Sequence, residues 1–226
     1  LIAAIAGSML SGCKKHGDAT EASIDPNVTE TTETPETSET TTEETTKPTK
    51  PTHALDEYKN AGVNELNSVP ILMYHRIYNM KNSETKYTGG NVDKDGYNRT
   101  SEAFEKDLRS FYEQGYRMMR LTDFVDGNID VAFGYSPLIL TFDDGINDVV
   151  IEGWNDDGTP KFETGCAIDV LEKIKAEYPD YNVTATFFLN YKLFCNNEED
   201  DRKVIKWLVD NGYDIGNHTY NHVKTT

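Results

Sequence analysis

From residue 69 onward, short apolar runs alternate with amphipathic stretches of helical length, and this alternation restricts the fold more than any other feature. The clearest strand is residues 138–142, where Leu-Ile-Leu-Thr-Phe forms an uninterrupted run typical of a buried strand. The other predicted strands are residues 69–74, 118–121, 185–189 and 213–216. Strands that alternate with helices imply parallel pairing through right-handed crossovers, so we predict an α/β fold.

The clearest helix is predicted over residues 101–114. Phe104, Leu108 and Phe111 recur at the spacing i, i+4 and i+7, which places them on one helical face, and Ser101 is a candidate N-cap. Further helices are predicted over residues 166–178 and 202–211.

Residues 18–53 differ from the rest of the chain, because Thr, Glu, Pro and Ser dominate them. No large apolar residue lies between Val28 and Leu55. Such a stretch cannot bury enough apolar surface to offset its conformational entropy. We therefore predict a disordered tether over residues 14–53, with a reach on the order of 30 Å or more, and a globular domain over residues 54–226.

Residues 1–12 are apolar or small and are followed at once by Cys13. This run is shorter than the roughly 20 apolar residues that a membrane-spanning helix needs. Residues 10–13, Leu-Ser-Gly-Cys, resemble a bacterial lipobox, in which the signal peptide is removed before a cysteine that becomes lipidated. We expect residues 1–13 to be such a signal peptide and Cys13 to anchor the protein outside the cytoplasmic membrane. A signal peptide cleaved elsewhere and a chance cysteine are the alternatives.

The net charge of −17 makes nucleic acid and anionic lipid headgroups poor partners. The expected membrane contact is therefore the lipid anchor alone, and we expect a monomer. Three cysteines are too few for a disulfide scaffold. The sequence leaves open whether Cys166 and Cys195 form a disulfide, since it gives no distance between them.

Two carboxylates, Asp143 and Asp144, directly follow the clearest predicted strand and precede Gly145. Ligands of parallel α/β sheets bind at the carboxyl ends of strands, and a glycine allows a sharp turn there. Adjacent carboxylates repel each other unless a cation or a shared proton intervenes. On its own the motif is compatible with a metal site or with a solvated strand exit.

Two histidines, His218 and His222, follow the last predicted strand. Residues at i and i+4 lie on one helical face, so we expect both imidazoles to reach one cation. The spacing is common in zinc sites. A pair of surface histidines is the alternative.

The two motifs together are more specific than either one. Thr-Phe-Asp-Asp-Gly at 141–145 and His-Thr-x-x-His at 218–222 resemble the first two motifs of the polysaccharide deacetylases, the fourth carbohydrate esterase family, also called the NodB-homology domain. Further stretches that are similar to the family lie at residues 70–77, 185–189 and 212–218.

The resemblance implies that Asp143 is the general base and that Asp144, His218 and His222 bind a divalent metal. Zinc is the expected ion, with cobalt, nickel and manganese as alternatives. Three protein ligands leave one position open for water, whose pKa a zinc ion lowers toward 7. The implied enzyme is a metal-dependent hydrolase that removes N- or O-linked acetyl groups from a cell-surface or extracellular polysaccharide.

The resemblance also implies a distorted (β/α) barrel with fewer than eight strands, of which residues 54–226 form an incomplete, N-terminal part. The family's later motifs supply an arginine and an aspartate that support the base and a histidine general acid. These motifs do not occur in this sequence, so we expect this chain alone to lack deacetylase activity and a chain that carries them to be active.

Residues 151–165 resemble an insertion beside the first motif, either a β-turn or hairpin that shapes the substrate groove or a surface loop. Trp154, Tyr191 and Tyr220 are candidates for contact with sugar rings, although aromatic side chains also serve as core or rim residues. His75 is either a cleft residue or a structural histidine.

Two other functions remain open from the sequence. The first is a catalytically inactive, carbohydrate-binding surface lipoprotein of the same fold. The second is a magnesium-dependent phosphoacceptor site at Asp143 and Asp144, for which His218 and His222 are not needed.

Overall fold

The computed structural model describes residues 56, 57, 60, 69–145, 149–191, 193–195 and 197–223. The predicted signal peptide, Cys13 and the predicted tether over residues 14–53 lie outside these described residues. In the described part of the chain, no helix has both the length and the apolar character that a membrane span requires.

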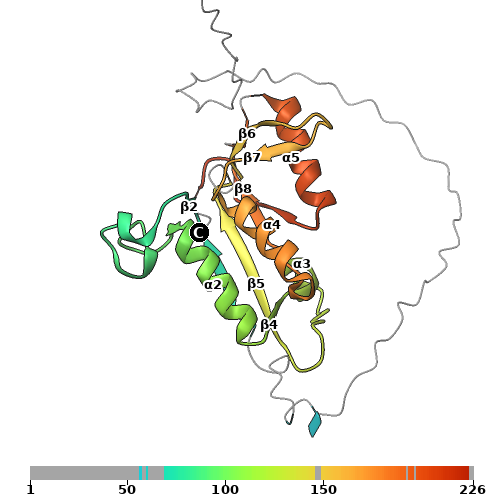
Figure 1. Cartoon of the computed structure of the whole chain (residues 1–226). Coiled ribbons are helices and arrows are strands. Elements are labelled where there is room, and N and C mark those ends of the chain that lie inside the picture. The colour runs from blue at the N-terminus through green and yellow to red at the C-terminus, as the bar shows by residue number, and fades with distance from the viewer. Residues whose placement is uncertain are drawn as a thin grey trace, which may run out of the picture.

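The core of the fold is a five-stranded sheet (Figure 1). Its strands are β1 (Ile71–Tyr74), β4 (Tyr116–Met118), β5 (Ser136–Asp143), β8 (Thr186–Leu189) and β9 (Asp214–Asn217). The order is β1-β5-β8-β9, with β4 paired to the first residues of β5, and every pairing is parallel. The predicted α/β fold with parallel strands is thereby confirmed. The described strands form an open path, so the barrel is not confirmed.

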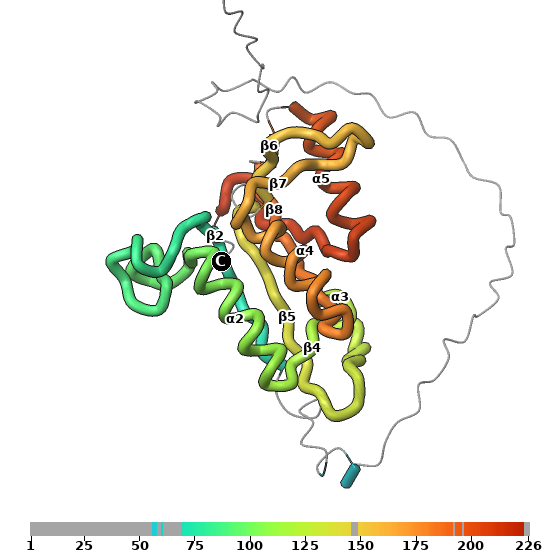
Figure 2. Tube along the Cα trace, in the orientation of Figure 1, coloured from blue at the N-terminus to red at the C-terminus, as the bar shows by residue number. Residues whose placement is uncertain are grey.

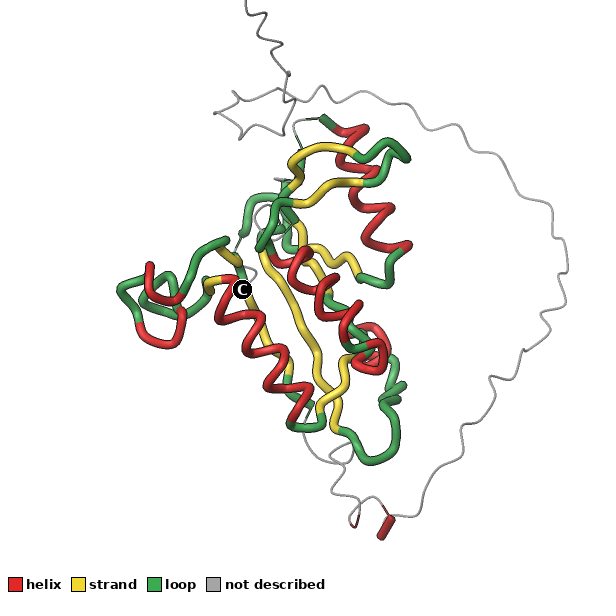
Figure 3. The backbone as a smooth tube through the Cα atoms, viewed as in Figure 1, coloured by secondary structure: helices red, strands yellow, loops and turns green. Residues whose placement is uncertain are grey.

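Helices pack against the sheet, and Figure 3 shows some of them beside the long central strand β5. They are α2 (Ser101–Glu113), α3 (Leu121–Val125), α4 (Ala167–Glu177) and α5 (Glu198–Asp210), with a short 3-10 helix, η3 (Pro179–Tyr181), after α4. Alternate residues of β5 face opposite sides, as strand geometry requires. Leu138, Leu140 and Phe142 belong to the main core with residues of α2 and α4, whereas Ile139 packs with Met119 on the other face.

An aromatic row crosses the sheet from β1 to the start of β9. Tyr74, Phe142 and Phe187 stack in succession from β1, β5 and β8, with ring centroids 5.6 and 5.1 Å apart. Tyr213, which precedes β9, meets Phe187 edge-on at 5.8 Å. Phe142 and Phe187 are completely buried. This packing holds the neighbouring strands in register, so the residues that follow them meet at one edge of the sheet.

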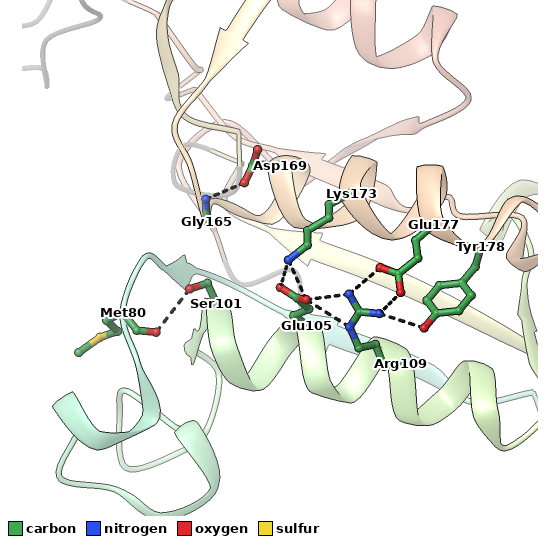
Figure 4. Close-up of polar contacts among 9 residues, drawn as sticks. All are labelled: Met80, Ser101, Glu105, Arg109, Gly165, Asp169, Lys173, Glu177 and Tyr178. Carbon is green, nitrogen blue, oxygen red and sulfur yellow. Dashed lines mark hydrogen bonds and ion pairs between the residues drawn. The ribbon is translucent and has the colours of Figure 1, made fainter.

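Helices α2 and α4 are joined by an ion-pair network across their exposed sides (Figure 4). Lys173 Nζ donates hydrogen bonds to both carboxylate oxygens of Glu105 at 2.8 Å. The guanidinium of Arg109 bridges Glu105 and Glu177, and it also donates to the hydroxyl of Tyr178 at 2.9 Å. The network therefore fixes one helix against the other over more than one turn.

Two predicted element boundaries are wrong near the start of the domain. The N-cap of α2 is Thr100 rather than Ser101, because the Thr100 side chain accepts a hydrogen bond from the Ala103 amide at 3.1 Å. The strand predicted at residues 118–121 is β4, which ends at Met118. Leu121 instead begins the short helix α3, which the sequence reasoning missed.

Helix α5 begins at Glu198, earlier than the predicted residue 202. Asn197 caps it by accepting a hydrogen bond from the Asp200 amide at 2.9 Å. Four acidic residues fill its first turn, where negative charge interacts favourably with the helix dipole. The apolar periodicity used for the prediction begins only after this acidic turn.

The insertion at residues 151–165 forms a β-hairpin and not an irregular surface loop. Strands β6 (Ile151–Trp154) and β7 (Pro160–Phe162) pair antiparallel. Phe162 packs against Trp207 of α5 with ring centroids 4.7 Å apart. The hairpin is thus anchored to α5, beside which Figure 1 shows it.

A second excursion projects away from the sheet between β1 and α2 (Figure 2). It contains β2 (Ile77–Tyr78) and β3 (Arg99–Thr100), which pair with each other, and the 3-10 helices η1 (Asn82–Glu84) and η2 (Thr88–Gly90). Both carboxylate oxygens of Asp93 accept backbone amide hydrogen bonds from residues 95–98, which fixes the tip of the loop.

No disulfide joins Cys166 to Cys195, and both are buried thiols. Burial raises the pKa of the Cys166 thiol to about 11, so this thiol stays protonated at neutral pH. A nucleophilic role for Cys166 is therefore disfavoured.

Candidate metal centre

Asp143 and Asp144 lie at the turn that ends β5. Asp143 is the last residue of the strand, and the next two residues, Asp144 and Gly145, have positive φ angles of 71° and 65°. A Cβ atom at Gly145 would lie 2.6 Å from Cδ2 of Leu189. Glycine suits this turn because the backbone φ is positive and because the Leu189 side chain would have to move to admit a Cβ atom. The turn presents two adjacent carboxylates at the carboxyl end of the sheet.

His218 and His222 lie in the segment that follows β9. The His218 amide donates to the Leu189 carbonyl at 2.9 Å, which extends the β8–β9 ladder by one step. The two histidines do not share a helical face, so that expectation is wrong. Thr219 and His222 have left-handed φ angles of 62° and 53°, and this turn brings the two imidazole centroids to 4.6 Å.

The structure brings three of the predicted residues together. Ligand atoms of Asp144, His218 and His222 all lie within 4.8 Å of one another. Nε2 of His218 is 3.5 Å from Oδ1 of Asp144, and Nε2 of His222 is 3.8 Å from the same oxygen. Asp143 lies beside the group, with its Oδ2 3.9 Å from Nε2 of His218. Side chains from the ends of β5 and β9 thus converge across the intervening strand β8.

This geometry fits a divalent cation. Ligand atoms at the zinc bond length of about 2.1 Å in a tetrahedral site are about 3.4 Å apart, close to the separations around Asp144. Nε2 of His218 is buried and has no hydrogen-bond partner among the described residues. A buried imidazole nitrogen that points toward two carboxylates without a hydrogen bond is a suitable metal ligand. One carboxylate and two imidazoles also match the ligand types that zinc prefers.

Asn190 was missed by the sequence reasoning. Its side-chain amide donates to Oδ1 of Asp144 at 3.2 Å, so it contacts the carboxylate around which the group is built. Asn190 directly follows β8, which lies between β5 and β9. The only signal in the sequence was its place as the first polar residue after a predicted strand.

The other candidate residues fall into two groups. Tyr191 and Tyr220 lie in contact beside the metal centre, with ring centroids 5.3 Å apart. Trp154 instead belongs to the hairpin, where the ammonium of Lys203 lies 5.5 Å from its ring centroid. The ring of His75 packs on Tyr97 at 4.9 Å.

Part of the chain, including the candidate metal centre, matches the model of a known protein family. Residues 132–226 match the family model for polysaccharide deacetylase. This segment of the chain is therefore similar to the polysaccharide deacetylase family. The deacetylase segment, residues 132–226, includes both carboxylates, Asn190 and both histidines of the candidate centre.

Among solved structures, the chain is similar to a de-N-acetylase from Aggregatibacter actinomycetemcomitans, with 14% sequence identity and a TM-score of 0.39. The match covers 68% of this chain and 55% of that one, so this chain spans about half of the solved protein. A comparison with curated proteins gave no match.

Proposed function

We propose that the protein is a metal-dependent hydrolase that removes N- or O-linked acetyl groups from a cell-surface or extracellular polysaccharide. The observation that carries the proposal is the convergence of Asp144, His218 and His222 within 4.8 Å, with Asp143 beside them. The deacetylase segment supports the reaction class, because all four residues lie within it.

Asp144, His218 and His222 would hold the cation, for which zinc is the proposed ion and cobalt, nickel and manganese are alternatives. When bound, such an ion supplies a Lewis acid that acidifies a water molecule and polarises the acetyl carbonyl. Asp144 and His218 directly follow strands β5 and β9, and the turn after β9 brings His222 to them, so the fold itself gathers the three ligands.

Asp143 is proposed as the general base. Its carboxylate lies at the edge of the three ligands, near enough to accept a proton from water that attacks the carbonyl carbon. Its side chain is only 16% exposed, which limits competing contacts with bulk water. In the complete reaction the C–N or C–O bond breaks, acetate leaves, and the proton ends on the released amine or hydroxyl. The groups that deliver this proton and support the base are expected on later motifs of the family.

The magnesium phosphoacceptor alternative is less compatible with this geometry. Magnesium prefers oxygen ligands in octahedral geometry. Two imidazole nitrogens lie within reach of Asp144 here, which favours zinc-type ligation instead. The alternative of an inactive carbohydrate-binding protein also expects binding of the polysaccharide. It differs from the proposal only in expecting no release of acetate.

Acetate release from N-acetylglucosamine oligomers by the full-length protein tests the proposal. We expect zinc-dependent release that falls by about 10²–10⁴-fold on Asp143→Asn, because this substitution keeps the shape and removes the proton acceptor. Turnover by the Asp143→Asn variant at the wild-type rate would contradict the role of Asp143. Oligomer binding without any acetate release by the wild type would favour the inactive alternative.

The proposal also places the protein outside the cytoplasmic membrane, attached through Cys13. A lipid anchor on a long tether suits an enzyme whose substrate is a surface polymer. Fractionation of cells that express the Cys13→Ser variant tests this location. We expect the wild type in the membrane fraction and loss of lipid labelling in the variant, and equal labelling of both would contradict the assignment.

A further inference from the structure

Two tyrosine side chains lie exposed beside the candidate metal centre. Tyr191 is 49% exposed and Tyr220 is 73% exposed, and their rings are in contact at a centroid distance of 5.3 Å and an interplanar angle of 39°. Burial of apolar surface stabilises a protein by about 25 cal/mol for each Å², and an aromatic ring left in water does not contribute this free energy. Adjacent exposed aromatic rings with polar surroundings are typical of a ligand-binding surface.

The backbone fixes this pair in place. The Tyr191 amide donates to the Tyr220 carbonyl at 3.2 Å, which ties the segment after β8 to the segment after β9. Next to Tyr220, Thr219 adopts a left-handed conformation, and its amide donates to Oδ1 of Asn217 at 2.7 Å. The backbone positions of the two tyrosines are therefore set relative to each other before a ligand binds, which lowers the entropy that binding must offset.

The pair is connected to the metal centre on both sides. Tyr191 directly follows Asn190, whose amide contacts Asp144. Tyr220 lies between His218 and His222 along the chain. The segments that carry the two rings therefore also carry residues of the candidate metal centre.

We propose that Tyr191 and Tyr220 form an aromatic platform for a pyranose ring that neighbours the acetylated sugar in the polysaccharide. This inference rests on the proposed function, because it assigns a binding position within the same site. A pyranose presents apolar C–H groups on its face and hydroxyl groups on its rim. The faces of aromatic rings suit the C–H groups, and the tyrosine hydroxyls suit hydrogen bonds with the rim.

The platform has a specific consequence for substrate length. Contacts to a neighbouring sugar are made only by an oligomer and are absent for a single acetylated sugar. The platform should therefore increase affinity for oligomers while leaving binding of the monosaccharide unchanged. It should not affect metal binding, because neither tyrosine is among the proposed ligands.

Calorimetric titration of the full-length protein tests the platform. The ligands are N-acetylglucosamine itself and its β-1,4- and β-1,6-linked hexamers. We expect the Tyr191→Ala/Tyr220→Ala variant to bind the hexamer preferred by the wild type about tenfold more weakly. The Tyr191→Phe/Tyr220→Phe variant keeps the ring faces, and its affinity for the hexamer should fall about threefold at most. Phe133→Ala removes a 43% exposed aromatic side chain that precedes β5, at the opposite end of that strand, and should bind as the wild type does.

Zinc affinity of each variant serves as the check that the site remains folded. The platform would be overturned if the double alanine variant bound the hexamer as tightly as the wild type does. It would also be overturned if the wild type bound neither hexamer. Tyrosine-dependent binding without acetate release would uphold the platform and contradict the proposed function. Acetate release with an unchanged KM for hexamer in the double variant would uphold the function and contradict the platform.

Discussion

At the scale of single residues, the carboxylate of Asp144 is the centre of the proposed site, since both imidazole contacts and the Asn190 amide meet at its Oδ1. The hydrogen bond from Asn190 orients this carboxylate. Residues that orient a metal ligand typically change metal affinity by 10–100-fold when replaced.

We therefore predict that Asn190→Ala weakens zinc binding by about tenfold or more. Competition with a chromophoric chelator measures the effect. Asn155→Ala, in the turn between β6 and β7, is the control and should keep the wild-type affinity. An unchanged affinity in Asn190→Ala would show that the amide does not position Asp144.

Substitution of Gly145, in the turn after β5, has two costs that can be measured separately: backbone strain at a positive φ and the contact of an added Cβ with Leu189. We predict that Gly145→Ala lowers the free energy of unfolding by about 2–4 kcal/mol, because the positive φ adds strain and the new Cβ meets Leu189. Gly127→Ala is the matched control, since Gly127 has φ +73° and no atom within 4 Å of an added Cβ. Urea unfolding should show a loss of only about 1 kcal/mol for Gly127→Ala. Equal losses in both variants would exclude the contact with Leu189 as a cause.

The sequence was sufficient to predict most residues of the candidate site, but it did not predict the backbone conformation around them. Asp143 and His218 were selected from their positions after predicted strands, and the structure places Asp143 at the last residue of β5 and His218 directly after β9. The spacing of His218 and His222 suggested a helix, but the same spacing also suits a left-handed turn. Asn190 could not be found without knowing that β8 lies between β5 and β9, because its partner is distant in sequence.

At the scale of elements, the pair α2 and α4 depends on charge as well as on apolar packing. The hydrogen bond from Lys173 is the main reason that the pKa of Glu105 lies below its ordinary value; desolvation opposes it, and Arg109 adds to the lowering. A carboxylate with a lowered pKa in the folded state contributes stability above its ordinary pKa and loses it as the pH falls through the folded value.

We therefore predict that the wild type loses more stability between pH 6 and pH 3 than the Glu105→Gln variant does. Urea unfolding at a series of pH values measures the difference. Glu113→Gln changes an exposed glutamate of the same helix and should follow the wild-type pH dependence. Parallel curves for the wild type and Glu105→Gln would contradict a role for this network in stability.

Most elements were predictable because their apolar periodicity is strong, as in β5 and α2. The boundaries failed where polar residues decide them. Thr100 rather than Ser101 caps α2, and the acidic first turn of α5 carries no apolar signal. The hairpin at residues 151–165 could not be separated from a loop, because its anchor is the distant ring of Trp207.

At the scale of the whole molecule, the proposed cation joins the ends of strands that are not neighbours. Asp144 follows β5 and the histidines follow β9, with β8 between them. A ligand that binds only the folded state stabilises it by about 2.7 kcal/mol at a concentration of 100 Kd. We predict that zinc raises the midpoint of thermal unfolding of the wild type but not of His218→Ala. An equal rise in both proteins would place the bound ion elsewhere.

The sequence could not establish whether the sheet stays open or closes into a barrel. The alternation of strands and helices predicted parallel pairing, which the structure confirms. Closure into a barrel depends on pairings between distant strands, and local periodicity carries no information about them.

The most direct test of the account is the visible absorption spectrum of the cobalt-loaded protein. Tetrahedral cobalt absorbs strongly, so the spectrum reports the ligands themselves rather than the reaction. We predict one bound cobalt ion with a tetrahedral spectrum in the wild type and in Asp143→Asn, and loss of that spectrum in Asp144→Asn, His218→Ala and His222→Ala. An unchanged spectrum in these three variants, or its loss in Asp143→Asn alone, would contradict the assignment of Asp144, His218 and His222 as ligands and of Asp143 as the base.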